Sequence, residues 1–333
     1  QDIYMDMLKE LEEAVAQIGS SSSMGNADAI FGGNTTKWKA FGNSMMLRLA
    51  MRMTKADAAS AQAWAVKAIS AGTMTSNDHL AAVTHTDGPE GINKNGHGEV
   101  FDVDSQMRLS ATFEAHLSGD PRLSVLFAPG SSNTVIVGMP NGSTSDSYVS
   151  ATTGLTVPGV TDRHVYAQTH PALRGKDVPM VFQTYAEVEF LKAEAAIRGW
   201  ISSSAKEHYD KGVTAAMKML KQLYPASTAI TDAEISAYLA GPGAYDASKG
   251  WEMAMNEYWK ATFLNEYEAY ANWRRTGYPT LTPTGHPNSV SNNQIFRRMI
   301  YPGGESATNG DNYAAAVARQ GADDFTTRMW WDK

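Results

Sequence analysis

The stretch VFQTYAEVEFLKAEAAIRGW, residues 181–200, decides the fold class of this chain. Its apolar and small residues recur at helical spacing, and SAKEHYDKGVTAAMKML (204–220) repeats the pattern after a turn of three serines. Small residues such as Ala193 and Ala205 let two neighbouring helices approach closely, and Tyr209 fills the space above them. The two stretches therefore predict an antiparallel helix pair of the tetratricopeptide kind.

The helical period recurs on both sides of this pair. Segments 3–18, 37–53, 60–72, 231–239 and 251–273 each carry apolar residues at helical intervals, with shorter helical pieces near 293–299 and 312–319. We therefore predict a mainly α fold in which tetratricopeptide-like helix pairs form an α/α superhelix. The helical scaffold occupies about residues 1–72 and 181–275 of a single domain that spans residues 1–333.

The helical pattern disappears between residues 73 and 180, where Gly, Pro, Asn, Thr and Asp dominate. The segment TVIVGMPNGST (134–144) predicts a short strand followed by an Asn141–Gly142 turn, and we expect a few further short strands nearby. So long a loop-rich insertion in a helical protein is usually functional, which makes it the expected ligand side. The C-terminal segment 276–333 is again rich in loops.

The composition excludes several classes of protein. A 43% hydrophobic and 19% charged chain is typical of globular proteins, and a net charge of −7 with no run of Lys or Arg argues against nucleic-acid binding. The absence of cysteine rules out thiol nucleophiles, cysteine-ligated zinc and disulfides. The sequence contains no apolar run of about 18 residues, the length that a membrane-spanning helix needs.

No catalytic motif stands out in the sequence. HExxH, GxSxG and GxxxxGK[ST] are all missing, and no two of the eight histidines are four residues apart on a helix. Glu187 and Glu194 share a helix face, but a structurally paired face is a commoner use of such residues than a glycosidase pair. We therefore expect no enzymatic activity.

One part of the loop-rich region could bind a metal ion. His85, Asp87, His97, Asp102 and Asp104 lie close in sequence, although without the spacing of an EF-hand. Loops rich in Asp, Asn and Gly usually satisfy their own turns. We therefore expect no metal or cofactor, and calcium is the ion that these oxygen ligands would suit if one is bound.

The stretch EAYANWRRTGYPTL (268–281) predicts a structural corner at the end of a long helix. Two arginines suit the carbonyl end of the helix dipole, a glycine can adopt the left-handed stop, and a proline prevents continuation. We expect the arginines to pair with glutamates of neighbouring helices, such as Glu187 or Glu194, and an anion clamp is the alternative. The corner residues are Trp273, Arg274, Arg275, Gly277 and Pro279.

Six phrases, in order along the chain, resemble the SusD/RagB family of outer-membrane nutrient-binding lipoproteins. They are WKAFGNSMMLRLAMRM (38–53), GDPRLSVLFAP (119–129), TYAEVEFLKAEAAIRGW (184–200), NWRRTGYP (272–279), IFRRMIYPGGES (295–306) and RMWWD (328–332). The resemblance implies an α-helical protein on the outer face of the outer membrane, held there by a lipidated N-terminal cysteine. It also implies capture of glycans, or in some members peptides, for a TonB-dependent transporter of the SusC type, without catalysis.

Two features of the sequence depart from this family. The lipid-bearing cysteine and the signal peptide are absent, so contact with a membrane would require an anchor that this chain lacks. The first residues, QDIYMDMLKELEEAV, look like a helix that normally follows an earlier helical section. We therefore expect an N-terminal part of the family domain to be missing.

A glycan ligand requires aromatic faces for its C–H surfaces and amide groups for its hydroxyls. Two loop stretches offer this combination, and we predict the ligand site there. The residues are Asn93, Asn95, His97, Phe101, Tyr148, His164 and Tyr166.

Three alternatives to glycan binding stay open on the sequence. The same architecture could bind peptides or another nutrient, a helical-repeat scaffold could bind only protein partners, and two carboxylates across a cleft would indicate a hydrolase.

Overall fold

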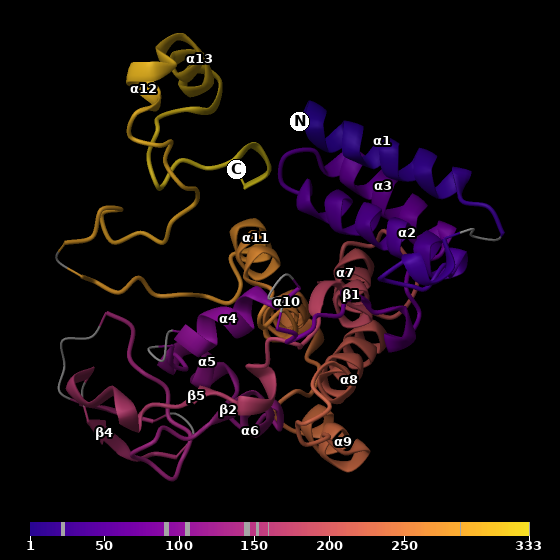
Figure 1. Cartoon of the computed structure of the whole chain (residues 1–333). Coiled ribbons are helices and arrows are strands. Elements are labelled where there is room, and N and C mark those ends of the chain that lie inside the picture. The colour runs from indigo at the N-terminus through magenta and orange to yellow at the C-terminus, as the bar shows by residue number, and fades with distance from the viewer. Residues whose placement is uncertain are drawn as a thin grey trace.

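The chain is mainly helical in the computed structural model, which describes residues 1–20, 24–89, 93–103, 107–142, 147–150, 153–158, 160–286 and 288–332 (Figure 1). The longer helices are α1 (Asp2–Gln17), α2 (Thr35–Arg52), α3 (Ala58–Ala71), α7 (Tyr185–Ile197), α8 (Ala205–Leu223), α9 (Asp232–Ala240), α10 (Gly250–Ala261), α11 (Glu266–Thr276) and α13 (Gly310–Gln320). The shorter ones are α4 (Gly96–Val103), α5 (Ala111–His116), α6 (Arg122–Leu126) and α12 (Glu305–Thr308). The predicted mainly α fold is confirmed.

The described strands form three separate antiparallel pairs. β1 (Ala81–Val83) pairs with β6 (Met180–Gln183), β2 (Phe127–Ala128) with β5 (Gln168–Thr169), and β3 (Ser147–Val149) with β4 (Thr156–Pro158). Short 3₁₀ turns lie at Gly25–Ala27, Asn77–His79, Val160–Val165, Pro171–Leu173, Ala247–Lys249 and Trp330–Asp332. The strands therefore form no larger sheet within the described residues, and each pair joins two segments of the loop-rich region.

The predicted pair α7–α8 lies at the centre of the helical scaffold, where α10 packs on both of its helices. α8 approaches α7 closely at Gly212, because a Cβ atom on this residue would lie 2.6 Å from a ring carbon of Phe190. Tyr209 is buried beside Phe190, with ring centroids 6.4 Å apart. Polar caps fix where these helices begin: the side chains of Thr184 and Ser204 each accept a hydrogen bond from a backbone N–H of the first turn.

Three buried ionic clusters join these helices to one another. In the first, Arg48 and Arg52 of α2 bind Glu187 of α7 and Glu268 of α11. The second cluster consists of Asp120, Arg122, Glu257 and Lys260, together with the hydroxyl of Tyr238. The third consists of Glu194, Arg198 and Arg275, together with the side chain of Asn272. Since each carboxylate is buried beside a cation, the pairs fix the positions of the helices without leaving a free charge inside.

The second cluster illustrates how strongly these charges interact. Burial alone would raise the pKa of Glu257, but Arg122 and Lys260 lower that pKa to about 2. Arg122 donates to Glu257 at 2.6 Å, and Lys260 at 2.8 Å.

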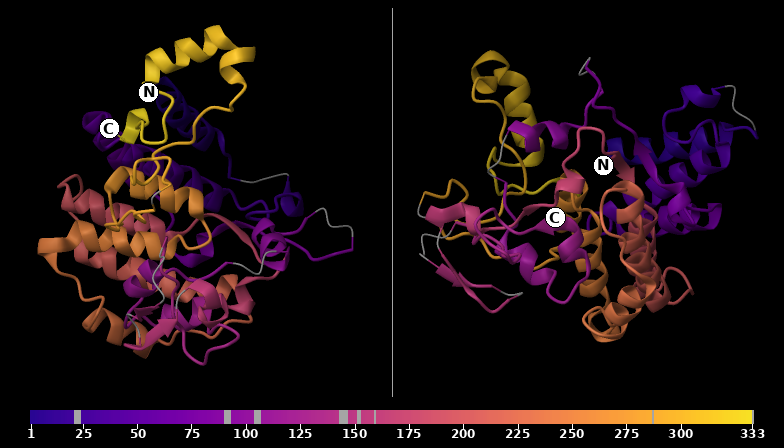
Figure 2. Two further views of the ribbon diagram at one scale, coloured as in Figure 1. Left: turned by 90° about the vertical axis from the view of Figure 1, so that its left-hand side faces the viewer. Right: turned by 60° about the horizontal axis from the view of Figure 1, so that its bottom comes forward.

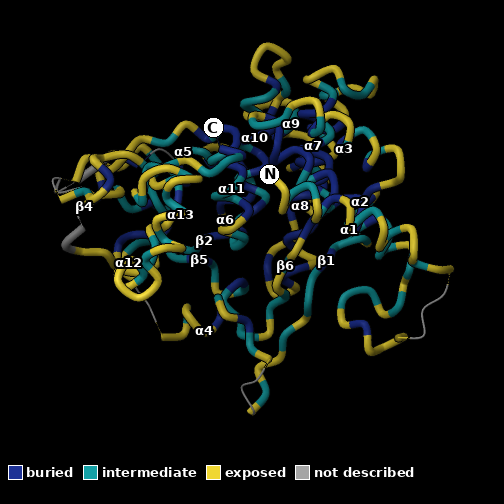
Figure 3. The backbone as a smooth tube through the Cα atoms, turned by 90° about the horizontal axis from the view of Figure 1, so that it is seen from above, coloured by how far each residue is buried: buried dark blue, intermediate teal, exposed yellow. Residues whose placement is uncertain are grey.

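The loop-rich region and the C-terminal segment lie on one side of the scaffold (Figures 1 and 2). α12 and α13 stand away from the body, and no described residue of α13 is buried. Buried residues gather around α7, α8 and α10, while β4, α12 and α13 are mostly exposed (Figure 3). None of the helices in the described ranges combines the length and the apolar character that crossing a lipid bilayer demands.

The single long helix predicted for residues 251–273 is wrong, because the structure has two helices there, α10 and α11. The hydroxyl of Thr262 donates to the carbonyls of Tyr258 and Trp259, which ends α10. Leu264 then adopts a left-handed conformation with φ 64°, and α11 starts after Asn265 in a new direction.

The strand predicted within 134–144 is also wrong, since in the described part of that stretch, residues 134–142, only an isolated bridge between Met139 and Ser110 forms. The backbone of 137–139 bonds instead to Leu109, Ala111 and Ala167, which are not an extended partner strand. The helical piece predicted near 293–299 does not form either, because Asn292 and Asn293 have φ angles of 51° and 57°.

Candidate functional site

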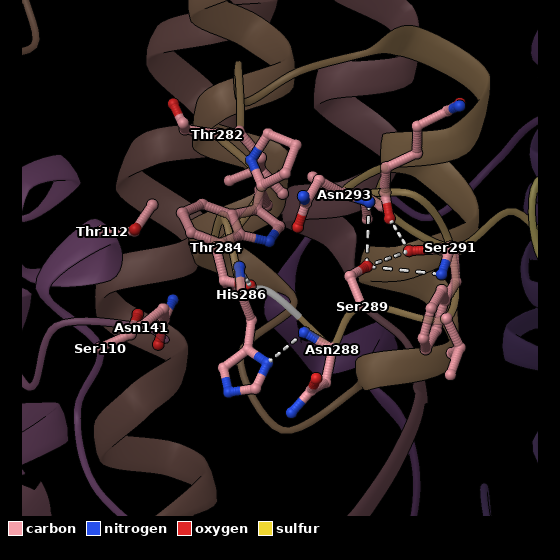
Figure 4. Close-up of a pocket in the computed structure, with 17 residues that line it drawn as sticks. Ser110, Thr112, Asn141, Thr282, Thr284, His286, Asn288, Ser289, Ser291 and Asn293 are labelled. Carbon is pink, nitrogen blue, oxygen red and sulfur yellow. Dashed lines mark hydrogen bonds between the residues drawn. The ribbon is translucent and has the colours of Figure 1, made fainter. Parts of the chain in front are cut away.

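A cavity of about 550 Å³ lies between the scaffold and the C-terminal segment, and we take it as the candidate site (Figure 4). Its walls come from parts of the chain far apart in sequence: the start of α5, the turn at Asn141, Trp259 of α10 and the loop 281–296. The volume falls within the range of small-molecule binding sites. We call it the main cavity.

Most of the residues that line the main cavity are polar but not acidic or basic. The described residues that line it include no Asp, Glu, Lys or Arg. The polar members are Ser110, Thr112, Asn141, Thr282, Thr284, His286, Asn288, Ser289, Ser291, Asn293 and Gln294; the apolar ones are Trp259, Leu281, Pro283, Val290, Ile295 and Phe296. Hydroxyl and amide groups both donate and accept hydrogen bonds, so this lining suits a neutral ligand with many hydroxyl groups.

The loop that forms one wall holds its shape by its own hydrogen bonds (Figure 4). The hydroxyl of Ser289 accepts from the backbone N–H of Asn293 at 2.9 Å, and the ring of His286 accepts from the N–H of Asn288 at 3.1 Å. The loop is anchored at its end by Phe296, which lines the cavity and stacks on Phe325 with ring centroids 4.7 Å apart. These bonds leave the side chains of Asn288 and Asn293 on the cavity wall.

Trp259 gives the main cavity its aromatic surface. Its indole is partly exposed and packs edge-on against Phe113 (4.7 Å between centroids) and His116 (5.3 Å). Burial lowers the pKa of His116, with the nearby charge of Lys260 acting in the same direction. The lowered pKa favours the neutral form of His116, and the contacts with Phe113 and His116 hold Trp259 in place at the main cavity.

The seven ligand residues predicted from the sequence lie elsewhere. Asn95 is buried, where its side chain accepts from the N–H groups of His97 and Gly98 and donates to the carbonyl of Val178. His97 bonds to Glu266 at 3.0 Å, and Asn93 is exposed.

The other predicted ligand residues divide between the fold and the surface. Tyr166 is buried and donates its hydroxyl hydrogen to the carbonyl of Pro158, whereas His164 is exposed. Phe101 is half-buried in α4, and the side chain of Tyr148 lies outside the described residues. None of the six whose side chains the structure describes lines the main cavity, and the role of all seven in ligand binding stays a prediction.

The predicted metal region shows carboxylates paired with lysines. Asp87 lies 3.5 Å from Lys94, and Asp102 lies 2.6 Å from Lys176. Among the described residues, no three His, Asp or Glu side chains come together as they would around a metal ion, and Asp104 lies outside these residues. The expectation that no metal binds, with calcium as the ion that would suit these ligands, stays a prediction.

The corner at the end of α11 has both of its arginines engaged. Arg275 donates two hydrogen bonds to Glu194, at 2.8 and 2.7 Å, whereas Glu187 binds Arg48. The guanidinium of Arg274 lies over the rings of Tyr270 and Trp331, at 4.3 and 4.5 Å from their centroids.

The backbone of this corner turns sharply away from the helix. Gly277 has φ 79° and donates its N–H to Trp273 at 2.7 Å, and the peptide bond before Pro279 is cis. The neighbouring Trp273 is only 7% exposed. Trp273 and Pro279 are therefore buried while Gly277 is exposed, and none of the three lines the main cavity.

Comparison with known proteins gives a consistent family assignment. A SusD-like family model, described as starch-binding and associating with the outer membrane, matches residues 1–302. A solved chitin-binding protein is 31% identical, with a TM-score of 0.86 over 100% of this chain and 73% of its own. A SusD-like protein from Bacteroidetes AC2a is 28% identical, with a TM-score of 0.83 over 100% of this chain and 76% of its own.

A SusD homologue from Parabacteroides distasonis shares the fold at 23% identity, with a TM-score of 0.84 over 100% of this chain and 74% of its own. No curated protein matches the chain.

Proposed function

Because this chain belongs to the SusD-like family of glycan-binding proteins that associate with the outer membrane, we propose that it captures a glycan at the cell surface in its main cavity. The uncharged, hydroxyl- and amide-rich lining beside Trp259 is the observation that carries this proposal. Chitin oligosaccharides are the first ligands to test, because the solved relative at 31% identity is a chitin-binding protein.

The chemistry of the main cavity suits a sugar in two ways. A pyranose ring has an apolar C–H face, which packs against an aromatic ring such as Trp259, and a rim of hydroxyl groups. Asn288, Asn293 and the serines and threonines of the walls can exchange hydrogen bonds with these hydroxyls in both directions.

The same lining favours binding without cleavage. Hydrolysis of a glycosidic bond normally requires two carboxyl groups flanking the bond, and the described lining of the main cavity offers none. We propose that the bound glycan leaves unchanged and passes to a TonB-dependent transporter of the SusC type, with a lipid anchor holding the full-length protein at the outer face. Copurification of such a transporter with the full-length protein from outer membranes would test this step, and its absence after mild cross-linking would argue against it.

Binding to the main cavity is tested by isothermal calorimetry with chitin and starch oligosaccharides. Replacing Asn288 or His286, both exposed on the cavity wall, with alanine should weaken binding about 3- to 10-fold, the usual effect of losing one hydrogen bond. Trp259→Ala should abolish measurable binding, because it removes the aromatic surface.

A control variant separates the main cavity from the region predicted by sequence. Asn93→Ala changes an exposed asparagine outside the main cavity, and we expect its affinity to equal that of the wild type. Melting curves check that each variant is folded. Loss of binding in Asn93→Ala with full binding in Asn288→Ala and His286→Ala would move the site to the loop-rich region.

A further inference from the structure

A second cavity, of about 260 Å³, lies next to the main one. Trp259 and Ser110 line both cavities, so one ligand can contact the two across these residues. About eight water molecules at their liquid volume would fill the second cavity, which is therefore large enough for a substituent but small for a chain of sugars.

The second cavity has a wall of aromatic rings. Its walls include Phe113, Phe127 and Phe263, which form one aromatic cluster: Phe113 stacks on Phe263 with centroids 5.6 Å apart, and Phe127 meets Phe263 at 5.2 Å. A sugar ring with hydroxyls on every side would lose hydrogen bonds against such walls. The cavity therefore favours a small apolar group.

One polar group stands apart on these apolar walls. Thr169 of β5 is only 7% exposed and lines the second cavity. Within the described part of the chain its hydroxyl has no hydrogen-bond partner, although it is not among the side-chain atoms sealed from solvent. A ligand carbonyl that accepts the hydrogen of this hydroxyl would add a hydrogen bond that the described part of the protein does not supply.

The charged residues at this cavity already have partners. Glu266 bonds to His97 at 3.0 Å, and the guanidinium of Arg108 donates to the carbonyls of Arg163 and Met107, each at 2.9 Å. Both charged side chains therefore hydrogen-bond to protein groups, whereas within the described part of the chain the hydroxyl of Thr169 does not.

Backbone strain marks both cavities. Leu264, with φ 64°, lines the second cavity, and Asn293, with φ 57°, lines the main one. Left-handed backbone in residues other than glycine costs free energy and gathers at ligand sites. Leucine is an especially unfavourable residue for this conformation.

We propose that the second cavity receives an acyl substituent carried by the glycan whose sugar rings occupy the main cavity, an inference that rests on the proposed function. The alkyl part of the acyl group lies against Phe113 and Phe263, and its carbonyl oxygen accepts a hydrogen bond from Thr169. The same chemistry occurs in an N-acyl amide and in an O-acyl ester, so we name the acyl group as the recognised feature. The protein then discriminates acylated from bare glycans.

Calorimetry with two matched pairs of ligands tests this inference in the wild-type protein. One pair is chitin oligosaccharides and their de-N-acetylated form; the other is acetylated xylo-oligosaccharides and their de-esterified form. We expect at least one acylated ligand to bind about 10-fold more tightly than its bare partner. De-N-acetylation adds positive charge, which the net charge of −7 would attract, so such a preference cannot arise from overall charge.

The affinities measured within the two ligand pairs show which kind of acyl group, if any, the protein recognises. Preference within the amide pair alone assigns an N-acyl ligand, and preference within the ester pair alone assigns an O-acyl ligand. Equal affinities within both pairs would overturn the acyl inference and leave the proposed function intact. Failure of every ligand, including starch oligosaccharides, to bind would overturn the proposed function and the inference with it.

Three variants locate the preference within the structure. Thr169→Val keeps the shape of the side chain and should weaken the acylated ligand about 3- to 10-fold while leaving the bare ligand unchanged. Ala269→Met, which adds volume at the wall of the second cavity, should remove the preference altogether. Asn288→Ala, in the main cavity, should weaken both members of a pair by the same factor. An unchanged preference in both Thr169→Val and Ala269→Met would refute the assignment.

Discussion

Replacing Glu194 with alanine isolates the ion pair that joins α7 to α11. The side chain of Glu194 is 0% exposed and that of Arg275 is 2% exposed, and two hydrogen bonds of 2.8 and 2.7 Å connect them. Arg198 adds a third bond to the same carboxylate, at 2.9 Å. After the substitution the guanidinium of Arg275 stays buried, and its remaining hydrogen bonds go to neutral groups such as Asn272.

The expected loss follows from this burial. Removing one partner of a buried pair typically costs about 3–5 kcal/mol, because the remaining charge has lost both water and its counterion. We therefore expect Glu194→Ala to lower the free energy of unfolding by about 3–5 kcal/mol. Glu194→Met combined with Arg275→Met removes both charges and should cost less than the single alanine substitution.

Urea unfolding followed by tryptophan fluorescence measures these losses. Glu13→Ala is the matched control, since Glu13 pairs with Lys9 at 3.7 Å with both side chains more than half exposed, and it should cost under about 0.5 kcal/mol. The reasoning also sets a pH dependence. Burial alone would raise the pKa of Glu194, but Arg275 lowers it overall, so the pair stabilises the fold above the unfolded-state pKa and loses this effect as the pH falls through the folded-state value. A loss below about 1 kcal/mol for Glu194→Ala at pH 7 would refute the reasoning.

Three further substitutions test other parts of the fold. Burial would raise the pKa of Asp28, but four hydrogen bonds lower it to about 2. Asp28→Asn should therefore lower the free energy of unfolding in urea by about 1–2 kcal/mol at pH 7. This difference from the wild type should vanish as the pH falls toward 2. The hydrogen bond between His97 and Glu266 raises the pKa of His97 and lowers that of Glu266. His97→Gln should therefore lower the free energy of unfolding by no more than about 0.5 kcal/mol at pH 5.5, where His97 is charged. At pH 8.5 it should have no measurable effect. Gly212→Ala places a methyl group against Phe190 and should cost about 1–3 kcal/mol by the same assay.

One control variant and one contradicting outcome apply to these predictions. Gly310→Ala alters a helical glycine with open space around it and should leave the stability unchanged or slightly raised. An equal cost of His97→Gln at both pH values would show that its packing, and not its charge, stabilises the fold.

The helical frame could be predicted from the sequence because its information is local. The period of apolar residues, the caps at Thr184, Ser204 and Thr231 and the stop at Gly277 all lie within a few residues of the helix ends they set. The break between α10 and α11 could not be predicted, because the period of apolar residues continues through Leu264, where the backbone turns.

The main cavity could not be predicted, because its walls come together only in three dimensions. Trp259 looked like one more apolar position on a long helix, and the loop from Leu281 to Phe296 looked like a tail. The density of Asn, Ser and Thr in TLTPTGHPNSVSNNQ (280–294) was the available signal. By contrast, Asn95 and Tyr166, chosen for their chemistry, spend their hydrogen bonds on the fold.

The ionic clusters also constrain the order in which a newly synthesised chain can assemble. Arg48 precedes Glu187 by 139 residues, Arg52 precedes Glu268 by 216, and Arg122 precedes Glu257 by 135. Until the distant glutamates are in place, α2 can form but cannot be buried without leaving a guanidinium unpaired, whereas Arg122 of α6 already has Asp120 two residues away. Burial of α2 therefore depends on counterions that lie far downstream in the sequence.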